Sequence, residues 1–192
     1  FPLAYAIIMP ALYAPIIVML LALIFRGVAF EFRWKAHRKF LWDWSFAGGS
    51  ILATFAQCVA LGALVQGIPA AGRAYAGGWW DWLSPFSLLT GVAVVVGYGL
   101  LGATWLNLKT HGELQARARR LALAAGIATV LLIGAVSLCT PFINPVYFGR
   151  WFAFPTAIFS IIVPVLVAAC AYVFWEGLAH DRHLTPFLAA LG

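Results

Sequence analysis

Long apolar runs separated by short polar connectors dominate the pattern along the chain. A bilayer core of about 30 Å requires roughly 20 apolar residues in a helix. Five uncharged stretches reach that length, at 3–25, 45–66, 85–108, 121–139 and 151–175, and a sixth apolar run begins at residue 184. None shows the alternating polarity of a membrane β-strand. The pattern therefore predicts an all-α, polytopic transmembrane helix bundle with five complete spans and the start of a sixth.

The composition agrees with a chain that is solvated by lipid. Hydrophobic residues make up 64% of the sequence and charged residues only 9%, whereas an average soluble domain carries about 25% charged residues. The formal net charge is +6, but the basic residues are confined to short connectors. No soluble basic and aromatic face is available to hold a nucleic-acid strand, so the expected surroundings are a lipid bilayer and no nucleic acid.

Charge alternates between successive connectors. Connectors 26–44, 109–120 and 176–183 hold ten of the twelve Lys and Arg residues, while connectors 67–84 and 140–150 hold two. Because short cytoplasmic loops carry the excess of basic residues, the first three connectors are predicted to be cytoplasmic. The first helix in the sequence then enters the membrane from the outside.

The sequence is interpreted as one transmembrane domain, 1–192, and as an internal fragment of a longer subunit. Its first residue, Phe1, already lies in an apolar run, and its last residues lie inside another. Segment 1–25 lacks the basic start and the small-residue cleavage site of a signal peptide.

Small residues and prolines predict how the helices pack. Helices in lipid approach one another closely where side chains are small, and proline bends a helix because it removes a hydrogen bond. We expect bends at Pro10, Pro15 and Pro164. We expect close packing along the second and third helices at Gly48, Gly49, Ala53, Ala56, Gly91, Gly97, Gly99, Gly102 and Ala103.

The four histidines argue against a redox centre on this chain. His37, His111, His180 and His183 all fall in connectors, whereas a haem inside the membrane needs an axial ligand within a span. The His180 and His183 pair could hold a metal, but no third ligand clusters with it. Three single cysteines show no metal-binding or redox spacing. We therefore expect no metal site and no directly bound cofactor.

Polar residues within or near the spans are the remaining candidates, because such residues are costly in lipid. Gln57 lies mid-span and could join two helices or contact a quinone head. Arg26 ends the first apolar run, and Glu31 follows five residues later. Arg26 could extend to the cytoplasmic interface, or it could favour the ionised form of a carboxylate on a proton route. The tryptophans at 79–82 could anchor the outer interface or stack on a quinone or lipid head.

The same sequence carries an ordered set of blocks. They are Phe-Pro-Leu-Ala-Tyr-Ala at 1–6, Ile-Phe-Arg-Gly-Val-Ala-Phe-Glu-Phe-Arg at 24–33, Trp-Asp at 42–43, Gly-Gly-Ser at 48–50, Ala-Tyr-Ala-Gly-Gly at 74–78, Asp-Trp-Leu at 81–83, Pro-Phe at 85–86, Leu-Leu-Gly-Ala-Thr-Trp at 100–105, Lys-Thr at 109–110 and Gly-Glu-Leu-Gln at 112–115. Weaker blocks follow at 150–152 and 186–188. As a set, they resemble subunit II of the cytochrome bd-type ubiquinol oxidases, most of all the cyanide-insensitive branch.

This resemblance implies a nine-helix subunit, of which the chain would be the third to seventh helices and the start of the eighth. In that family the b and d haems and the quinol-oxidising loop belong to subunit I. The complex oxidises quinol, reduces dioxygen to water and takes protons from the cytoplasm, in the bacterial inner membrane. The chain would then be the haem-free structural and proton-path partner of subunit I in a heterodimer. It would not be catalytic alone, although it could bind a structural quinone.

The resemblance also points to two site residues. Arg26 and Glu31 stand where the family keeps a basic residue and an acid at the end of its third helix, which makes them candidates for a proton or charge-compensation path. The family's Trp-Asp-Gly-Asn block would lie before Phe1.

Two functions of other classes compete with the oxidase interpretation. A secondary transporter would need broken helices meeting at the midplane and inverted repeats. The prolines of the first helix fit broken helices, but no repeated partner is present in the sequence. An assembly scaffold would differ from an oxidase subunit if changes at Arg26 and Glu31 impaired assembly and left turnover intact.

Overall fold

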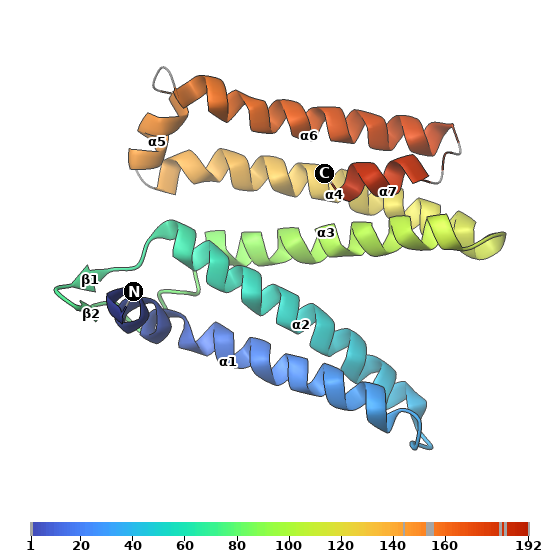
Figure 1. The fold of residues 1–192 in the computed structure, drawn as a ribbon, viewed down its shortest axis with the longest axis horizontal. Coiled ribbons are helices and arrows are strands. Elements are labelled where there is room, and N and C mark those ends of the chain that lie inside the picture. Colours follow the sequence, from blue (N-terminus) through green and yellow to red (C-terminus); the bar gives the residue numbers. More distant parts are fainter. Residues whose placement is uncertain (1, 144, 153–155, 181, 183, 192) are drawn as a thin grey trace. The chain divides into compact units, whose positions relative to one another are not determined.

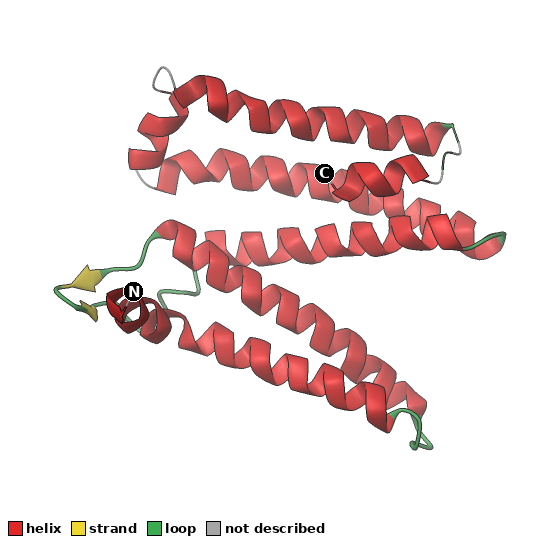
Figure 2. Ribbon diagram, in the orientation of Figure 1, coloured by secondary structure: helices red, strands yellow, loops and turns green. Residues whose placement is uncertain are grey.

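The computed structural model describes residues 2–143, 145–152, 156–180, 182 and 184–191. These residues form helices α1 (Pro2–Phe32), α2 (Lys39–Gln66), α3 (Pro85–Lys109), α4 (Glu113–Ile143), α5 (Pro145–Phe152), α6 (Thr156–Ala179) and α7 (Leu184–Leu191) (Figure 1). A hairpin of two short antiparallel strands, β1 (Ala70–Ala71) and β2 (Ala74–Tyr75), lies between α2 and α3 (Figure 2).

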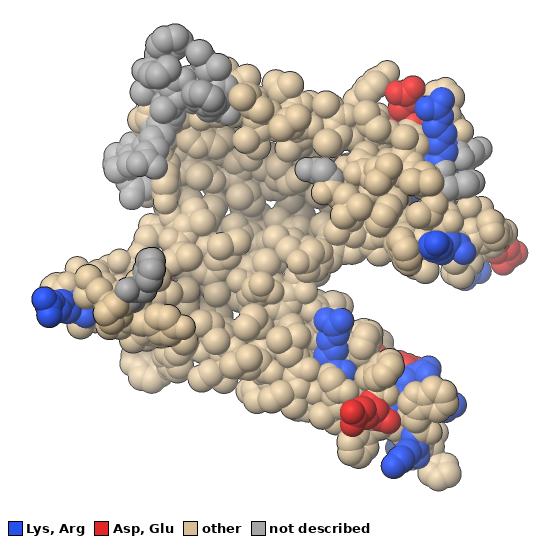
Figure 3. All heavy atoms as spheres, in the orientation of Figure 1, with Lys and Arg blue, Asp and Glu red and all other residues tan. Residues whose placement is uncertain are grey.

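Five of these helices confirm the predicted fold class. Helices α1 to α4, together with the Ser160–Ala179 part of α6, are each long and apolar enough to cross a membrane. Most of their large apolar side chains are exposed, as Leu21 and Phe25 are on α1, which is the arrangement expected of a multi-pass membrane protein. In each part of the chain, Lys and Arg gather near helix ends on the face shown in Figure 3.

The chain divides into two compact units, and the first comprises Phe1–Val95. In this unit α1 packs along α2, and α1 also contacts β2. A close approach of the two helices is possible because Gly49 has no side chain, since a Cβ there would lie 2.7 Å from the carbonyl oxygen of Ala22. Near the hairpin, Tyr75 and Trp82 pack against a small core formed by Ala11, Leu12 and Ala63.

The first part of α3 belongs to the same unit and contacts α2 through small residues. A Cβ at Gly91 would lie 2.8 Å from the ring of Phe55. The hydroxyl of Thr90 donates a hydrogen bond to the carbonyl oxygen of Cys58 at 3.1 Å. At Gly49 and Gly91, the absence of a side chain therefore allows the close helix packing that the sequence predicts.

The second unit comprises Val96–Gly192. Its core brings together the second half of α3, α4 and α6, with Ala122 and Phe174 at the centre and Ala189 of α7 packed against them. Gly126 lets the Phe174 ring approach α4, since a Cβ there would lie 2.6 Å from that ring. Helices α6 and α7 pack together, as do α4 and α6.

Several glycines on the predicted packing faces have no close neighbour. A Cβ at Gly48, Gly97, Gly99 or Gly102 would meet no heavy atom of the described residues within 4 Å. The spacing Gly99-x-x-x-Ala103 therefore does not mark a glycine contact within the described chain. Ala103 itself is buried in the core of the second unit.

The helices extend beyond the apolar stretches, which corrects the predicted connectors. Helix α1 continues to Phe32, so Arg26 lies inside a helix and does not end it. Helix α4 begins at Glu113, so Arg117, Arg119 and Arg120 stand on its first turns and not in a loop. Arg, Glu and Leu are good helix formers, and a helix need not stop where the hydrocarbon ends.

The fifth predicted span is also wrong at its start. The stretch 151–175 was expected to be one helix, but Trp151 and Phe152 belong to α5 and the next helix begins at Thr156. Pro155 comes directly before that start in the sequence.

The predicted prolines lie inside helices. Pro10 and Pro15 are within α1 and Pro164 is within α6, and α4 also contains Pro141. In Figure 1 the first turns of α1 run in a different direction from the rest of that helix. This bend is the effect expected from two prolines that each remove a backbone donor.

Candidate functional site

Arg26 stands on α1 with its guanidinium against an aromatic ring of α2. Its Cζ atom lies 5.5 Å from the centroid of the Phe46 ring. Its backbone abuts Gly49, where a Cβ would lie 3.1 Å from the Arg26 nitrogen. A cation over an aromatic face at an exposed site is stabilised by about 0.5–1 kcal/mol. The contact holds the charge of Arg26 beside α2.

Glu31 is not paired with Arg26. The two residues form no salt bridge, and both are exposed on α1. Residues five apart on a helix are separated by about 140° around its axis, so the two side chains leave α1 on different faces. The structure therefore places both sequence-predicted site residues at the same end of α1 without bringing them into contact.

A different pair bridges the ends of α1 and α2. Arg33 donates a hydrogen bond from Nε to Oδ1 of Asp43 at 2.5 Å. This hydrogen bond and the charge of Asp43 raise the pKa of Arg33 above its usual value. The rings of Phe32 and Trp42 stack beside them, with centroids 5.4 Å apart. Sequence reasoning missed this pair, although Asp43 is an acid within a basic connector.

The connector between α2 and α3, which contains the hairpin, lies at the opposite ends of α1 and α2. A hydrogen bond between the phenol of Tyr75 and the carboxylate of Asp81 holds this connector in a folded conformation. The hydroxyl of Tyr75 lies 3.0 Å from Oδ2 of Asp81 and 2.8 Å from the carbonyl oxygen of Gly78. Oδ2 of Asp81 also accepts a hydrogen bond from the backbone N–H of Gly78 at 2.8 Å. Burial raises the pKa of Tyr75, and the hydrogen bond to Asp81 and the Asp81 charge raise it further.

Aromatic rings surround this closed connector. The ring of Tyr13 on α1 meets the ring of Trp79 edge to face at 5.4 Å, and Nε1 of Trp82 donates to the carbonyl oxygen of Trp79 at 2.8 Å. Trp79 and Trp80 remain exposed. A pocket of about 250 Å³ lies between Pro10, Tyr13, Tyr75 and Trp79, among others. Exposed tryptophans of this kind suit the boundary between lipid and water.

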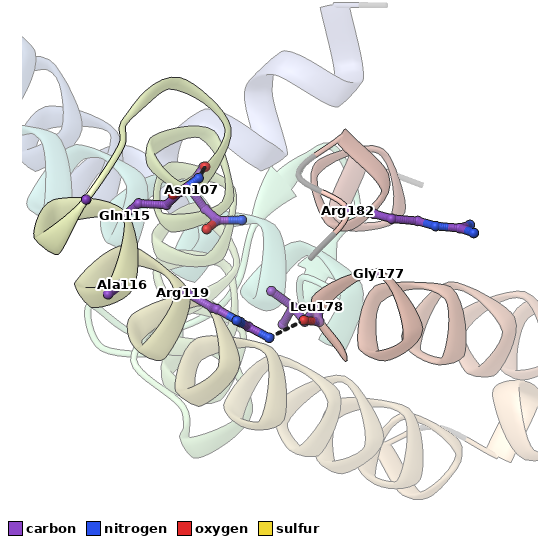
Figure 4. A pocket seen from close by; sticks show the side chains of 8 residues that line it. Asn107, Gln115, Ala116, Arg119, Gly177, Leu178 and Arg182 are labelled. Carbon is purple, nitrogen blue, oxygen red and sulfur yellow. Dashed lines mark hydrogen bonds between the residues drawn. The ribbon is translucent and has the colours of Figure 1, made fainter. Parts of the chain in front are cut away.

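The second unit contains a polar pocket where α3, α4 and α6 have their ends. We call it the Asn107 pocket. Its volume is about 180 Å³, and it is lined by Asn107, Gly112, Gln115, Ala116, Arg119, Gly177, Leu178 and Arg182 (Figure 4). Gln115 donates from Nε2 to the backbone carbonyl oxygen of Asn107 at 3.0 Å. Arg119 donates from Nη2 to the carbonyl oxygen of Leu178, which joins the start of α4 to the end of α6.

The polar residues that the sequence placed at the end of α3 have distinct roles. Thr104 is fully buried, and its hydroxyl bonds to the carbonyl oxygens of Leu100 and Leu101, each at 3.0 Å. Asn107 is 3% exposed, whereas Tyr98 is 58% exposed. Gln57 on α2 is exposed, and its side chain makes no hydrogen bond to any described residue. The prediction that Gln57 joins two helices is therefore not met within the described chain.

Histidines and cysteines do not gather into a metal site among the described residues. His37 and His111 lie in connectors between helices, and His180 follows the end of α6. A ring nitrogen of His180 lies 3.0 Å from the carbonyl oxygen of Glu176. His183 lies outside the described residues, so the His180 and His183 pair has no described geometry.

Comparison with known proteins identifies a family that matches the whole chain and relatives that match about two thirds of it. A family model described as cytochrome bd terminal oxidase subunit II matches residues 1–192. The chain is 35% identical over 138 residues to cytochrome bd-I ubiquinol oxidase subunit 2 of Escherichia coli strain K12, over 68% of the chain and 36% of that protein. It is 37% identical over 129 residues to cytochrome bd ubiquinol oxidase subunit 2 of Bacillus subtilis strain 168, over 64% of the chain and 37% of that protein.

A third relative is similar at a comparable level. The chain is 32% identical over 138 residues to a probable cytochrome oxidase subunit 2 of Haemophilus influenzae, over 68% of the chain and 36% of that protein. The chain thus spans little more than a third of the length of the curated relatives that it matches.

Proposed function

Because the chain belongs to the cytochrome bd terminal oxidase subunit II family, we propose that it forms part of a quinol oxidase. In this proposal the chain is the membrane-embedded partner of a haem-bearing subunit I, with which it forms a heterodimer in the bacterial inner membrane. The observation that carries the proposal is the family match over residues 1–192. Five helices long and apolar enough to cross a membrane support it.

We place the b and d haems on the partner subunit. A haem within the membrane needs an axial ligand at that depth, and His37, His111 and His180 lie in turns or connectors. The described histidines of this chain therefore do not fit an embedded haem. Electron transfer from quinol to dioxygen is assigned to the partner, and this chain supports it.

A structural quinone would fit the apolar side of the second unit. A cleft of about 830 Å³ lies between α4 and α6 and is lined by residues such as Val130, Ile133, Leu138 and Val163. An adjoining apolar pocket of about 260 Å³ includes Phe174. These side chains suit an isoprenoid tail, because ligand pockets for apolar groups are lined mainly by aliphatic and aromatic residues.

We also propose an orientation and a route for charge. Segments 26–44, 109–120 and 176–183, each a connector together with the helix ends beside it, face the cytoplasm, because they carry ten of the twelve Lys and Arg residues. Arg26 and Glu31 then lie near the cytoplasmic end of α1, where protons would enter. Arg26 would hold positive charge beside α2, and Glu31 would exchange protons at the exposed end of the helix.

Affinity purification of the chain within its full-length subunit tests the proposed function. We expect a second membrane subunit to co-purify and to carry haem absorption bands, and we expect the isolated subunit to show none. A chain that purifies alone and takes up a substrate into vesicles would overturn the proposal in favour of a transporter.

A further inference from the structure

Three aromatic side chains line the pocket between α1 and the connector that follows α2. Tyr13 comes from α1, and Tyr75 and Trp79 come from the connector. The rest of the lining consists of Pro10, Ala11, Gly77 and Gly78. We call this space the aromatic pocket. It lies within the first unit, where α1 contacts β2.

Two of these rings are arranged as a corner. The rings of Tyr13 and Trp79 have centroids 5.4 Å apart and planes that meet at 83°. Trp79 is 75% exposed, so most of its surface is open to a ligand. The face of an aromatic ring carries negative charge density and attracts a cation. Ring faces gathered around one space form part of an aromatic cage, which is an arrangement that binds ammonium groups.

A carboxylate lies directly behind this pocket. Oδ2 of Asp81 accepts hydrogen bonds from the phenol of Tyr75 and the backbone N–H of Gly78. A Cβ at Gly77 would overlap the same oxygen, so the carboxylate rests against the backbone that lines the pocket. Two unlike charges a few ångströms apart near a protein surface attract each other appreciably. The charge of Asp81 therefore favours a cation in the aromatic pocket.

No cationic side chain of this connector competes for the space. Arg73 carries the one Lys or Arg charge of segment 67–84, and it does not line the pocket. The described lining also holds no carboxylate side chain, because Asp81 lies behind Gly77. A metal ion such as Ca²⁺ takes several oxygen ligands, whereas an ammonium group is held by ring faces. The charge and the lining together favour an organic ammonium.

The size and place of the pocket narrow the class of ligand further. A volume of about 250 Å³ equals about eight water volumes, which accommodates an ethanolamine group. Trp79 and its neighbour Trp80 are both exposed, as suits the boundary between lipid and water. Phospholipid headgroups lie at that depth. We propose that the aromatic pocket binds the ammonium group of a phospholipid headgroup, which meets the rings of Tyr13 and Trp79 while Asp81 supplies the compensating charge.

The test measures lipid binding and not turnover, so its outcome is separate from that of the proposed oxidase function. The full-length subunit is purified with any partner subunit and stripped of lipid in a maltoside detergent. Native mass spectrometry then compares three probes. They are dioctanoyl phosphatidylethanolamine, dioctanoyl phosphatidylglycerol, which keeps the tails and the phosphate but lacks the ammonium, and phosphoethanolamine, which lacks the tails. We expect saturable binding of phosphatidylethanolamine at least about fivefold tighter than that of the other two.

Variants connect the binding to the pocket. Trp79→Leu removes the ring and keeps an apolar side chain, and Asp81→Asn removes the charge and keeps the size. Each is expected to weaken binding of phosphatidylethanolamine at least about fivefold. Trp79→Phe keeps an aromatic face and is expected to bind more tightly than Trp79→Leu. Trp80→Leu removes an exposed tryptophan that does not line the pocket, and it is expected to bind as the wild type does.

Four results would overturn the proposal, each judged on variants that elute from a size-exclusion column as the wild type does. The first is equal binding of phosphatidylethanolamine and phosphatidylglycerol by the wild type. The second is that phosphoethanolamine binds as tightly as the lipid, because the occupant would then be a free amine. The third is that Trp79→Leu binds no more weakly than Trp79→Phe or Trp80→Leu. The fourth is that Asp81→Asn binds as the wild type does.

Discussion

The phenol of Tyr75 donates a hydrogen bond to the carboxylate of Asp81 across 3.0 Å. The same carboxylate oxygen accepts the backbone N–H of Gly78, so two short segments of the connector between α2 and α3 are held together. The aromatic side chains of Trp82 and Tyr75 pack against α1 beside this link. The connector is therefore a folded cap on the end of the α1 and α2 pair.

The link makes the stability of the first unit depend on pH in the alkaline range. The pKa of Tyr75 is raised above its usual value of 10.0 by burial and by Asp81. A raised pKa in the folded state gives a stabilisation that is complete below the unfolded value and is lost as pH rises through the folded value. We expect the unfolding temperature to fall as pH rises above about 10, less steeply in Tyr75→Phe.

Ultraviolet titration of the phenol measures the same effect directly. In Asp81→Asn the ionisation of Tyr75 should move to lower pH, because the carboxylate charge no longer opposes it. An unchanged titration in that variant would show that Asp81 does not control Tyr75.

Gly49 is expected to be the most sensitive helix-packing glycine on α2 beside α1. In Gly49→Ala the new Cβ would meet the Ala22 carbonyl oxygen at 2.7 Å and the Arg26 backbone at 3.1 Å. Backbone atoms move only with the helix, so overpacking should cost about 1–3 kcal/mol. Unfolding in a denaturing detergent measures this loss.

Gly48→Ala is the matched control. A Cβ at Gly48 meets nothing within 4 Å among the described residues, and alanine favours a helix by about 1 kcal/mol over glycine. We expect this variant to be as stable as the wild type or more so. Equal losses in the two variants would contradict the close approach of α1 and α2 at Gly49.

Gln57 is expected to face protein in the assembled subunit. It is exposed in the middle of α2, and a carboxamide in lipid is costly. The variant Gln57→Met, which places an apolar side chain there, should weaken assembly with the remaining helices by about 0.6–2 kcal/mol. Detergent-induced dissociation measures this loss. Leu52→Met, on the same helix, should change little. A more stable assembly in Gln57→Met would indicate that the side chain faces lipid.

Arg26 is expected to contribute to proton uptake and turnover through its positive charge and its position beside Phe46. Arg26→Ala should lower quinol oxidase turnover and proton uptake in the full complex, and Arg26→Lys should retain part of both because the charge is kept. Glu31→Gln should lower proton uptake. Arg38→Ala removes an arginine from the turn between α1 and α2 and serves as the control. Wild-type rates in all variants would contradict a role in the proton path.

The spans follow from hydropathy because lipid contact demands uninterrupted apolar length, and all five predicted stretches lie at least partly in spanning helices. The ends of the helices were harder to predict from the sequence, because residues such as Arg26 and Arg117 are as common in helices as in connectors. Hydropathy does not register the boundary between α5 and α6, because it falls within one apolar run.

The candidate site was predictable only as a set of positions. Arg26 and Glu31 were predicted as charges at the end of an apolar run. That they lie on different faces of α1 could not be predicted, because it depends on the helix continuing to Phe32. The Asn107 pocket joins residues 107–119 to residues 177–182. No pattern in the sequence indicates that these segments meet, since their contact depends on how α3, α4 and α6 pack.

Quinol-dependent oxygen consumption tests the central claim most directly. Bacterial membranes that lack this subunit, but contain the other oxidase subunit, would be compared with membranes in which the full-length subunit is restored. We predict that restoration returns haem absorption and quinol-dependent oxygen consumption together. Full oxygen consumption by the same bd-type oxidase without this subunit would contradict the account.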